Sequence, residues 1–272
     1  EELADALRAA GELQPNSLNT ILTHLGENIT EAAEAEHVRD HYVGALSKIK
    51  DSGLDAYLSV KLTQLGLEMS EEFCLRNLCS IIKRAGEFGN MVWIDMEQSQ
   101  YVDRTISVFR QVRARFPNVG LCLQSYLYRT EKDLHDLIPL QPAIRLVKGA
   151  YAEPADVAYP KKSDVDANYQ RLIGTLLENA KKQHVLVGIG THDPALIRYS
   201  AQKASQEALS RDELEFQLLF GIRTEEQLRL AAEGHRVRAL ISYGSFWFPW
   251  YVRRLAERPA NVWFVVKSLL PR

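Results

Sequence analysis

A repeated alternation of two sequence patterns constrains the fold of this chain more than any other feature. Short apolar runs rich in β-branched and aromatic residues recur, and stretches with helical periodicity lie between them. The apolar runs cover residues 20–26, 56–62, 91–96, 119–126, 143–149, 184–192, 215–222 and 238–244, of which the first is the weakest. The helical stretches cover residues 71–88, 102–116, 168–182, 193–209 and 224–233. This alternation is typical of βαβ units in a parallel sheet.

The length of the chain indicates how these units are arranged. The chain has 272 residues, which is near the length typical of one (βα)8 barrel. Its strand candidates fit a closed barrel better than an open doubly wound sheet, and no GxGxxG motif follows the first of them. We therefore predict an α/β fold, a (βα)8 barrel of the TIM type, formed as a single domain by residues 1–272.

Composition and motifs exclude several classes of protein. The net charge is −2, which argues against nucleic acid or an anionic membrane surface as the main partner. Cys74, Cys79 and Cys122 form no CxxC pair, which favours buried, reduced thiols in a cytoplasmic compartment. The motifs GxxxxGK[ST], HExxH and GxSxG do not occur, and we expect no metal site.

Polar or charged residues lie at or near the ends of most predicted strands. They are Lys61, Asp95, Gln124, Arg145, Lys148, Thr191, His192, Gln217 and Tyr243. The carboxyl ends of the strands form the active face of a (βα)8 barrel, and it is costly to bury any such group without a partner. A ring of these residues therefore predicts a polar ligand or a polar network at the barrel mouth.

Each member of this ring also has a simpler explanation. A residue at the end of a strand often only emerges into solvent. Arg145 could form a salt bridge with Asp95 instead of contacting a ligand. His192 could merely precede a helix, because Asp193 is a good N-cap residue and Pro194 suits the first helical position.

The spacing of two cationic residues requires a bend. Arg145 and Lys148 are three residues apart, so a regular strand would point them to opposite faces. Gly149 permits a bend that returns Lys148 to the mouth. The connection that follows, residues 152–166, fits either a mobile lid or a plain surface loop.

An arginine pair near the C-terminal end of the sequence predicts an anion site. Arg253 and Arg254 lie near the start of a predicted helix whose first turn contains Pro249. Glu257 follows at a helical spacing and can order either guanidinium group. Such a pair at a barrel mouth suits a carboxylate or a phosphate, whereas the simpler alternative is an amphipathic helix with exposed arginines.

The chain resembles the proline dehydrogenase family over nearly its whole length. The matching segments are LGENIT (25–30), LSVKLTQLGL (58–67), WIDMEQS (93–99), LQSYLYRT (123–130), IRLVKGAY (144–151), GTHD (190–193), EFQLLFGI (215–222) and YVRRLAERPAN (251–261). The segments IRLVKGAY and RRLAER are specific to the family. The resemblance implies a distorted (βα)8 barrel that holds FAD noncovalently over the carboxyl ends of the strands.

The resemblance also implies a reaction, which is the first step of proline catabolism. L-Proline would be oxidised to Δ1-pyrroline-5-carboxylate by hydride transfer to N5 of FAD, and a quinone would reoxidise the flavin. A quinone acceptor implies peripheral association with the inner face of the cytoplasmic membrane.

The family motifs further imply which residues bind the substrate. Lys61, Arg253 and Arg254 would pair with the substrate carboxylate, and Asp95 would fix the geometry of this cluster. Tyr243 would line the proline ring. Because hydroxyproline-oxidising relatives are expected to have a smaller residue there, Tyr243 favours proline over 4-hydroxyproline as the substrate.

Roles toward the flavin follow from the same motifs. The residues implied to contact FAD are Met96, Gln124, Arg145, Lys148, Gly149, Ala150, Thr191, His192 and Glu257. Arg145 would lie near N5 of the flavin. Glu27 does not belong to this set, and the motifs imply that it acts as a gate or as the ion-pair partner of an arginine. One departure is Trp250, which stands where the family usually has tyrosine three residues before the arginine pair.

Two other functions are compatible with a charged barrel mouth. A class I aldolase-like barrel could use Lys148 as a Schiff-base nucleophile and the arginine pair to bind a phosphate. A barrel without catalytic activity could bind an amino acid or hold partners together, but this reading requires an incomplete ring of charged residues.

Overall fold

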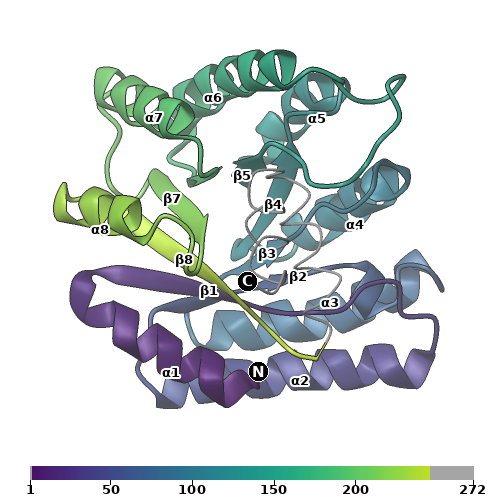
Figure 1. Ribbon diagram of the computed structural model, residues 1–272. Coiled ribbons are helices and arrows are strands. Elements are labelled where there is room, and N and C mark those ends of the chain that lie inside the picture. The colour runs from purple at the N-terminus through teal and green to yellow at the C-terminus, as the bar shows by residue number, and fades with distance from the viewer. Residues whose placement is uncertain (1, 246–272) are drawn as a thin grey trace, which may run out of the picture.

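Parallel strands form a closed barrel in the computed structural model of this chain, which describes residues 2–245 (Figure 1). The strands are β1 (Leu18–His24), β2 (Ala56–Val60), β3 (Val92–Ile94), β4 (Val119–Gln124), β5 (Ala143–Val147), β6 (Val187–Gly190), β7 (Leu214–Leu219) and β8 (Arg236–Tyr243). They pair in chain order, and β8 closes the barrel on β1. Each strand overlaps one of the apolar runs, and β1, β7 and β8 begin one or two residues before theirs. The prediction of an α/β barrel of the TIM type is confirmed.

Helices surround the strands on the outside of the barrel (Figure 1). They are α1 (Leu3–Leu13), α2 (Ala32–Asp51), α3 (Glu71–Glu87), α4 (Val102–Arg113), α5 (Thr130–Leu137), α6 (Lys162–Gln183), α7 (Pro194–Gln206) and α8 (Thr224–Ala232). The sequence predicted α3, α4, α6, α7 and α8, but not α1, α2 or α5. The pattern was present in α2, which buries Val38, Tyr42 and Ala45 at spacings of three and four residues.

Apolar side chains form two separate clusters, one on each side of the strands. The larger cluster joins strand residues such as Leu22 and Ile94 to the surrounding helices. The smaller cluster contains Ile21, Trp93 and Ala143. Because successive side chains of a strand point to opposite faces, Ile21 and Trp93 point away from the helices and into the barrel. The apolar core is therefore mainly a layer between the barrel and its helices.

The connection between β5 and α6 is shorter than predicted. It ends at Lys161, because α6 begins at Lys162, about one helical turn before the predicted end of the loop. Backbone hydrogen bonds tie it to the segment after β4, from Tyr128 N to Val157 O at 3.1 Å and from Tyr159 N to Tyr126 O at 2.8 Å.

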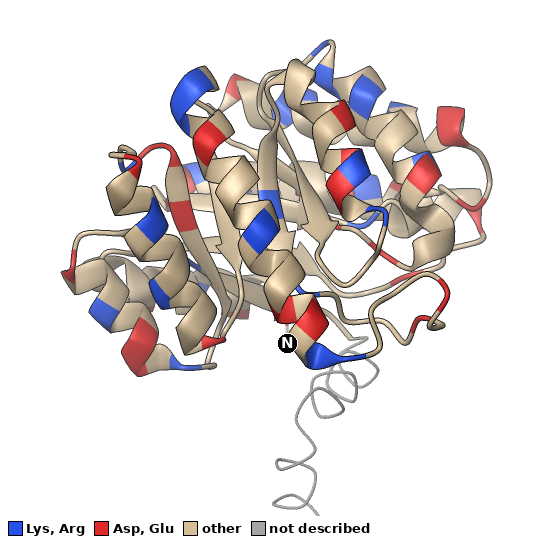
Figure 2. Cartoon of the chain, turned by 90° about the horizontal axis from the view of Figure 1, so that it is seen from above, with Lys and Arg blue, Asp and Glu red and all other residues tan. Residues whose placement is uncertain are grey.

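The outer surface carries charges of both signs. Figure 2 shows lysine and arginine residues mingled with aspartate and glutamate residues along the outer helices. Many of them form ion pairs one helical turn apart, for example Lys132 with Asp136 at 2.6 Å. Within residues 2–245, no helix combines the length and the apolar character needed to cross a membrane.

Candidate active site

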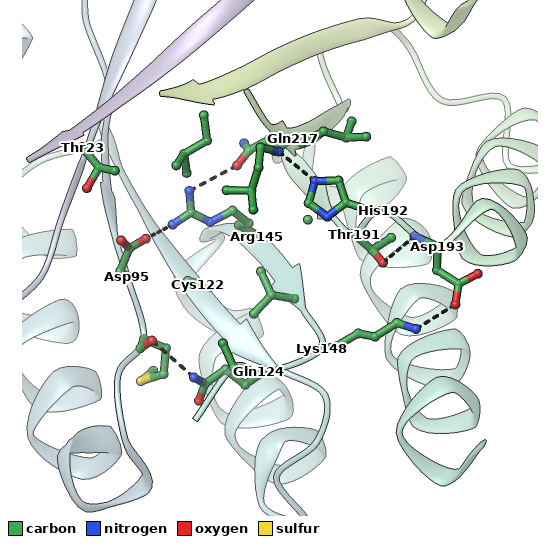
Figure 3. A pocket seen from close by; sticks show the side chains of 18 of the residues that line it. Thr23, Asp95, Cys122, Gln124, Arg145, Lys148, Thr191, His192, Asp193 and Gln217 are labelled. Carbon is green, nitrogen blue, oxygen red and sulfur yellow. Dashed lines mark hydrogen bonds and ion pairs between the residues drawn. The ribbon is translucent and has the colours of Figure 1, made fainter. Parts of the chain in front are cut away.

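A cavity of about 720 Å³ lies at the carboxyl ends of the strands (Figure 3). Its walls include nearly every residue that the family motifs single out within the described chain: Glu27, Lys61, Asp95, Met96, Gln124, Arg145, Lys148, Gly149, Ala150, Thr191 and His192. These residues come from loops and strand ends that are far apart in the sequence. The volume lies in the range of about 300–1,000 Å³ that is usual for small-molecule and cofactor sites.

Three charged residues form a cluster on one wall of this cavity. Asp95 Oδ2 accepts a hydrogen bond from Lys61 Nζ at 3.1 Å, and Asp95 Oδ1 accepts one from Ser59 Oγ at 2.7 Å. Arg145 also pairs with Asp95 through Oδ1. Burial alone would raise the pKa of Asp95, but the charges of Lys61 and Arg145 outweigh it and hold that pKa below its usual value. The cluster thus presents a net positive charge.

The salt bridge proposed as an alternative role for Arg145 is therefore present. It does not remove Arg145 from the cavity, because the residue still lines the wall beside Gln217. Arg145 is nearly buried, with 4% of its side chain exposed, and its guanidinium lies 5.3 Å from the centre of the Trp93 ring. Burial among these contacts fixes the guanidinium in one position.

A second buried carboxylate ties together the loops that follow the first three strands. Glu97 accepts hydrogen bonds from Thr63 N at 3.1 Å and from Thr63 Oγ1 at 2.5 Å. Thr63 Oγ1 in turn accepts one from Asn28 N at 3.1 Å. Burial raises the pKa of Glu97 to about 7. Asn28 is next to Glu27 in the sequence, Thr63 lies two positions after Lys61, and Glu97 lies two positions after Asp95. The network therefore positions the charged wall of the cavity.

The predicted bend after β5 is present. Gly149 has a φ of +120°, and a Cβ atom there would lie 2.3 Å from the Tyr126 ring. The bend brings Lys148 to the cavity, where its Nζ pairs with Asp166 at 2.5 Å and with Asp193 at 2.8 Å. The Lys148 amino group is thus held in ion pairs with two carboxylates, an arrangement that does not favour the aldolase interpretation.

The loop after β6 combines a helix cap with cavity residues. Asp193 caps α7 by accepting a hydrogen bond from Ala195 N at 3.0 Å, with Pro194 in the first turn, as predicted. His192 nevertheless also lines the cavity, and its Nε2 accepts a hydrogen bond from Leu219 N at 2.9 Å. The capping explanation and the cavity role are therefore compatible.

Gln124 supplies an observation that fits a bound cofactor. Its Nε2 donates to the backbone oxygens of Met96 and Glu97 at 3.3 and 3.2 Å. Its buried Oε1 has no hydrogen-bond partner within the described residues, although the side chain lines the cavity. A buried acceptor of this kind fits a ligand that carries an N–H group, which the flavin ring does.

The structure corrects the expectation for Tyr243. Its hydroxyl lies 2.9 Å from His41 Nε2 on α2, and its ring packs beside His24. It does not line the cavity, whereas Leu240 and Ser242 do. The reason is strand alternation, because Tyr243 follows Ser242 and points to the opposite face of β8. Tyr243 therefore gives no reason to prefer proline over 4-hydroxyproline.

The predicted anion site on the arginine pair lies outside the described residues. This applies to Arg253, Arg254 and Glu257, and also to Trp250 at the position where the family usually has tyrosine. The roles assigned to them by the family motifs stay predictions.

Several cavity residues were missed by the sequence analysis. They include Thr23, Cys122, Tyr151, Arg223, Leu240 and Ser242. Cys122 could have been found, because it lies two positions before Gln124 and so shares its face of β4. Arg223 follows β7 in an irregular turn with a φ of +51°, which no sequence pattern indicated.

Comparison with known sequences shows similarity along nearly the whole chain. A family model described as proline dehydrogenase matches residues 6–267. Proline dehydrogenase 2 of Bacillus subtilis (strain 168) is 38% identical over 258 residues, which are 95% of this chain and 84% of that protein. The proline dehydrogenase of Deinococcus radiodurans is 38% identical over 279 residues, covering 99% of this chain and 87% of that protein.

Solved structures show the same fold. Proline utilization A (PutA) from Bdellovibrio bacteriovorus, inactivated by N-propargylglycine, matches with a TM-score of 0.87 at 22% identity over 94% of this chain. The match covers 31% of the length of that solved chain. A mutant of PutA from Bradyrhizobium japonicum matches with a TM-score of 0.78 at 21% identity, covering 87% of this chain and 28% of that one.

Proposed function

The chain belongs to the proline dehydrogenase family, and we propose that it oxidises L-proline to Δ1-pyrroline-5-carboxylate with bound FAD, which a quinone then reoxidises. The observation that carries this proposal is the cavity at the barrel mouth. It gathers Lys61, Asp95, Arg145 and the segment Lys148–Ala150, which are motif residues from separate parts of the chain. Because quinones dissolve in lipid, the reoxidation step would bring the protein to a membrane surface as a peripheral partner.

The carboxylate of proline would bind to the cationic wall of the cavity. Lys61 would pair with it, and Arg253 and Arg254 would complete the site. Asp95 supports this role because it fixes Lys61 while leaving the cluster with a net positive charge. Holding the substrate at its carboxylate would set the orientation of the ring carbon that loses the hydride. The ring nitrogen must be unprotonated at that moment, because its lone pair drives the hydride out.

The flavin would be held by Arg145 of the charged cluster and by further residues that line the cavity. These further residues are Met96, Gln124, Lys148, Gly149, Ala150, Thr191 and His192. The family motifs add Glu257 from the C-terminal segment. Bound FAD would supply the two-electron oxidising power by accepting the hydride at N5. The buried guanidinium of Arg145 would stabilise the negative charge that develops on the flavin ring. Gly149 leaves room for the Tyr126 ring, which a Cβ atom at this position would meet at 2.3 Å.

Visible absorption spectra test the reaction and the cofactor together. We expect the purified protein to be yellow with bound FAD, and we expect anaerobic L-proline to bleach the flavin bands. Protein that binds no flavin, or flavin that stays oxidised with proline, would overturn the proposal. Treatment with borohydride and a keto acid would then test Lys148 as a Schiff-base nucleophile.

The arginine pair can be tested separately from the cofactor. Replacing Arg253 or Arg254 by methionine should raise KM for proline about tenfold or more, since a charge-assisted hydrogen bond to the carboxylate is lost. FAD content should remain that of the wild-type protein. The matched control is Arg8→Met, because the Arg8 side chain is 71% exposed on α1. Wild-type kinetics in both variants of the pair would show that the carboxylate binds elsewhere.

A further inference from the structure

A chain of buried polar side chains runs through the barrel interior, away from the cavity wall. Arg145 Nη1 donates to Gln217 Oε1 at 3.3 Å, and Gln217 Nε2 donates to Glu215 Oε1 at 2.8 Å. On the other side of Glu215, Oε2 accepts a hydrogen bond from Arg238 Nε at 2.7 Å. Arg238 Nη1 then pairs with Asp55 Oδ1 at 2.8 Å. The chain therefore links the cavity wall to a carboxylate that precedes β2.

These side chains have little freedom to rearrange. The exposed fractions of Glu215, Gln217 and Arg238 are 0%, 4% and 1%. Glu215 and Gln217 are two residues apart on β7, so both point into the barrel. Arg238 lies on the neighbouring strand β8, opposite Gln217 in the register of the two strands. Glu215 and Arg238 do not line the cavity, so water cannot replace a partner that either of them loses.

The chemistry of the groups fixes the direction of every hydrogen bond in the chain. An ionised carboxylate only accepts hydrogen bonds, and a guanidinium only donates them. Gln217 lies between one of each, so its NH2 group must face Glu215 and its Oε1 must face Arg145. If the amide were reversed, two donors would meet at Arg145 and two acceptors would meet at Glu215. Arg238 occupies the second oxygen of Glu215 and so holds that carboxylate in place.

We propose that Glu215 and Arg238 are positioning residues that act on Arg145 through Gln217. They orient the Gln217 amide, which then offers Arg145 a hydrogen-bond acceptor on the side away from Asp95. Arg145 is thereby held between Asp95 and Gln217, as Figure 3 shows. The inference rests on the proposed function in one respect, namely that Arg145 acts on the bound flavin.

A purely structural role for Glu215 makes a different prediction. If Glu215 only neutralised the buried charge of Arg238, its replacement by glutamine would be harmful whatever stood at position 217. If it orients Gln217, the effect must depend on that neighbour. Exchanging the two residues provides the test. In the double exchange, the carboxylate stands at position 217 and accepts hydrogen bonds from Arg145 and from the amide NH2 group at position 215. The oxygen of that amide accepts a hydrogen bond from Arg238.

The experiment compares Glu215→Gln, Gln217→Glu and the double exchange with the wild-type holoenzyme. We expect Glu215→Gln to lower kcat about tenfold with KM for proline changed less than about twofold, because the carboxylate site is untouched. Gln217→Glu should also lower kcat, since two carboxylates then meet. The double exchange should recover kcat to within about threefold of the wild-type value. Wild-type kcat in Glu215→Gln, or a double exchange no better than the single variants, would overturn the proposal.

Thermal melting of the flavin-free proteins keeps the test independent of the reaction. We expect Glu215→Gln to lower Tm in the wild-type background and to raise it in the Gln217→Glu background. A decrease in both backgrounds, or a double exchange that does not fold, would overturn the proposal. If the wild-type protein fails to oxidise proline, the proposed function falls, and the melting result still decides whether Glu215 orients Gln217.

Discussion

Replacing Asp95 by asparagine should destabilise the protein more than the loss of one surface charge would. Asp95 lies between two cations, Lys61 and Arg145, whose side chains are only 12% and 4% exposed. The substitution keeps the size of the side chain and removes its charge. Both cations would then remain at the cavity wall without their common counter-ion.

The size of the effect follows from the burial of these groups. Removing one partner of a buried ion pair typically costs about 3–5 kcal/mol, because the remaining charge is left uncompensated. The Asp95 side chain is itself 17% exposed, and asparagine can still accept a hydrogen bond from Ser59 or Lys61. We therefore expect a loss of about 3 kcal/mol in the free energy of unfolding, at the lower end of that range.

Urea denaturation of the flavin-free protein at pH 7 measures this loss. The matched control is Asp136→Asn, which removes the partner of Lys132 in a pair exposed on α5 and should leave the unfolding free energy unchanged. The charges around Asp95 hold its pKa below the usual value, so its contribution is complete above the unfolded pKa. It should be lost only as the pH falls through the lower folded pKa. Equal stability of both variants at neutral pH would refute the reasoning.

Two further predictions concern Glu97 and Gly149. Burial raises the pKa of Glu97 to about 7, so the folded protein binds its proton more tightly than the unfolded chain does, and this contribution is lost as the pH rises from about 4.5 through 7. Urea titrations at several pH values should show that wild type loses about 3 kcal/mol relative to Glu97→Gln over this interval, and parallel curves would contradict the assignment. Gly149→Ala should lower stability by about 2 kcal/mol and reduce FAD content, because the added Cβ would lie 2.3 Å from the Tyr126 ring at a φ of +120°. Gly174→Ala is its control, since nothing beyond the nearby backbone of α6 lies within 4 Å of the added Cβ, and it should raise the melting temperature.

The barrel was predictable because its strands leave a local signal. A strand buried on both faces appears as a short apolar run, and each run in the sequence became a strand. Two of the helices that were not predicted leave a weaker local signal. The helix α5 covers only Thr130–Leu137, which is too short for its periodicity to stand out. In contrast, α2 is long, but its buried residues include alanines, which add little to an apolar pattern.

A feature of the site could be predicted where the residue type has one main structural use. Gly149 indicated a bend, and the bend is present. The family motifs implied that Tyr243 lines the proline ring, but the alternation of faces along β8 turns it toward His41 and places Leu240 and Ser242 in the cavity. The hydrogen bonds from Thr63 to Glu97 could not be predicted, since they join loops 34 residues apart. No local pattern carries information about such a pairing.

The outer layer of the molecule is apolar, whereas the barrel interior holds buried polar and charged side chains beside a small apolar cluster, and this division separates two kinds of constraint. Substitutions at positions such as Leu22 and Ile94 act on the outer layer and so on whether the chain folds. Substitutions at Arg145 or Gln217 act on the interior hydrogen bonds and so on what the barrel can bind. The two sets alternate residue by residue along the same strands. A lineage could therefore alter its chemistry by a substitution at an interior position and restore the lost stability by a substitution at the next position of the same strand, which lies in the outer layer.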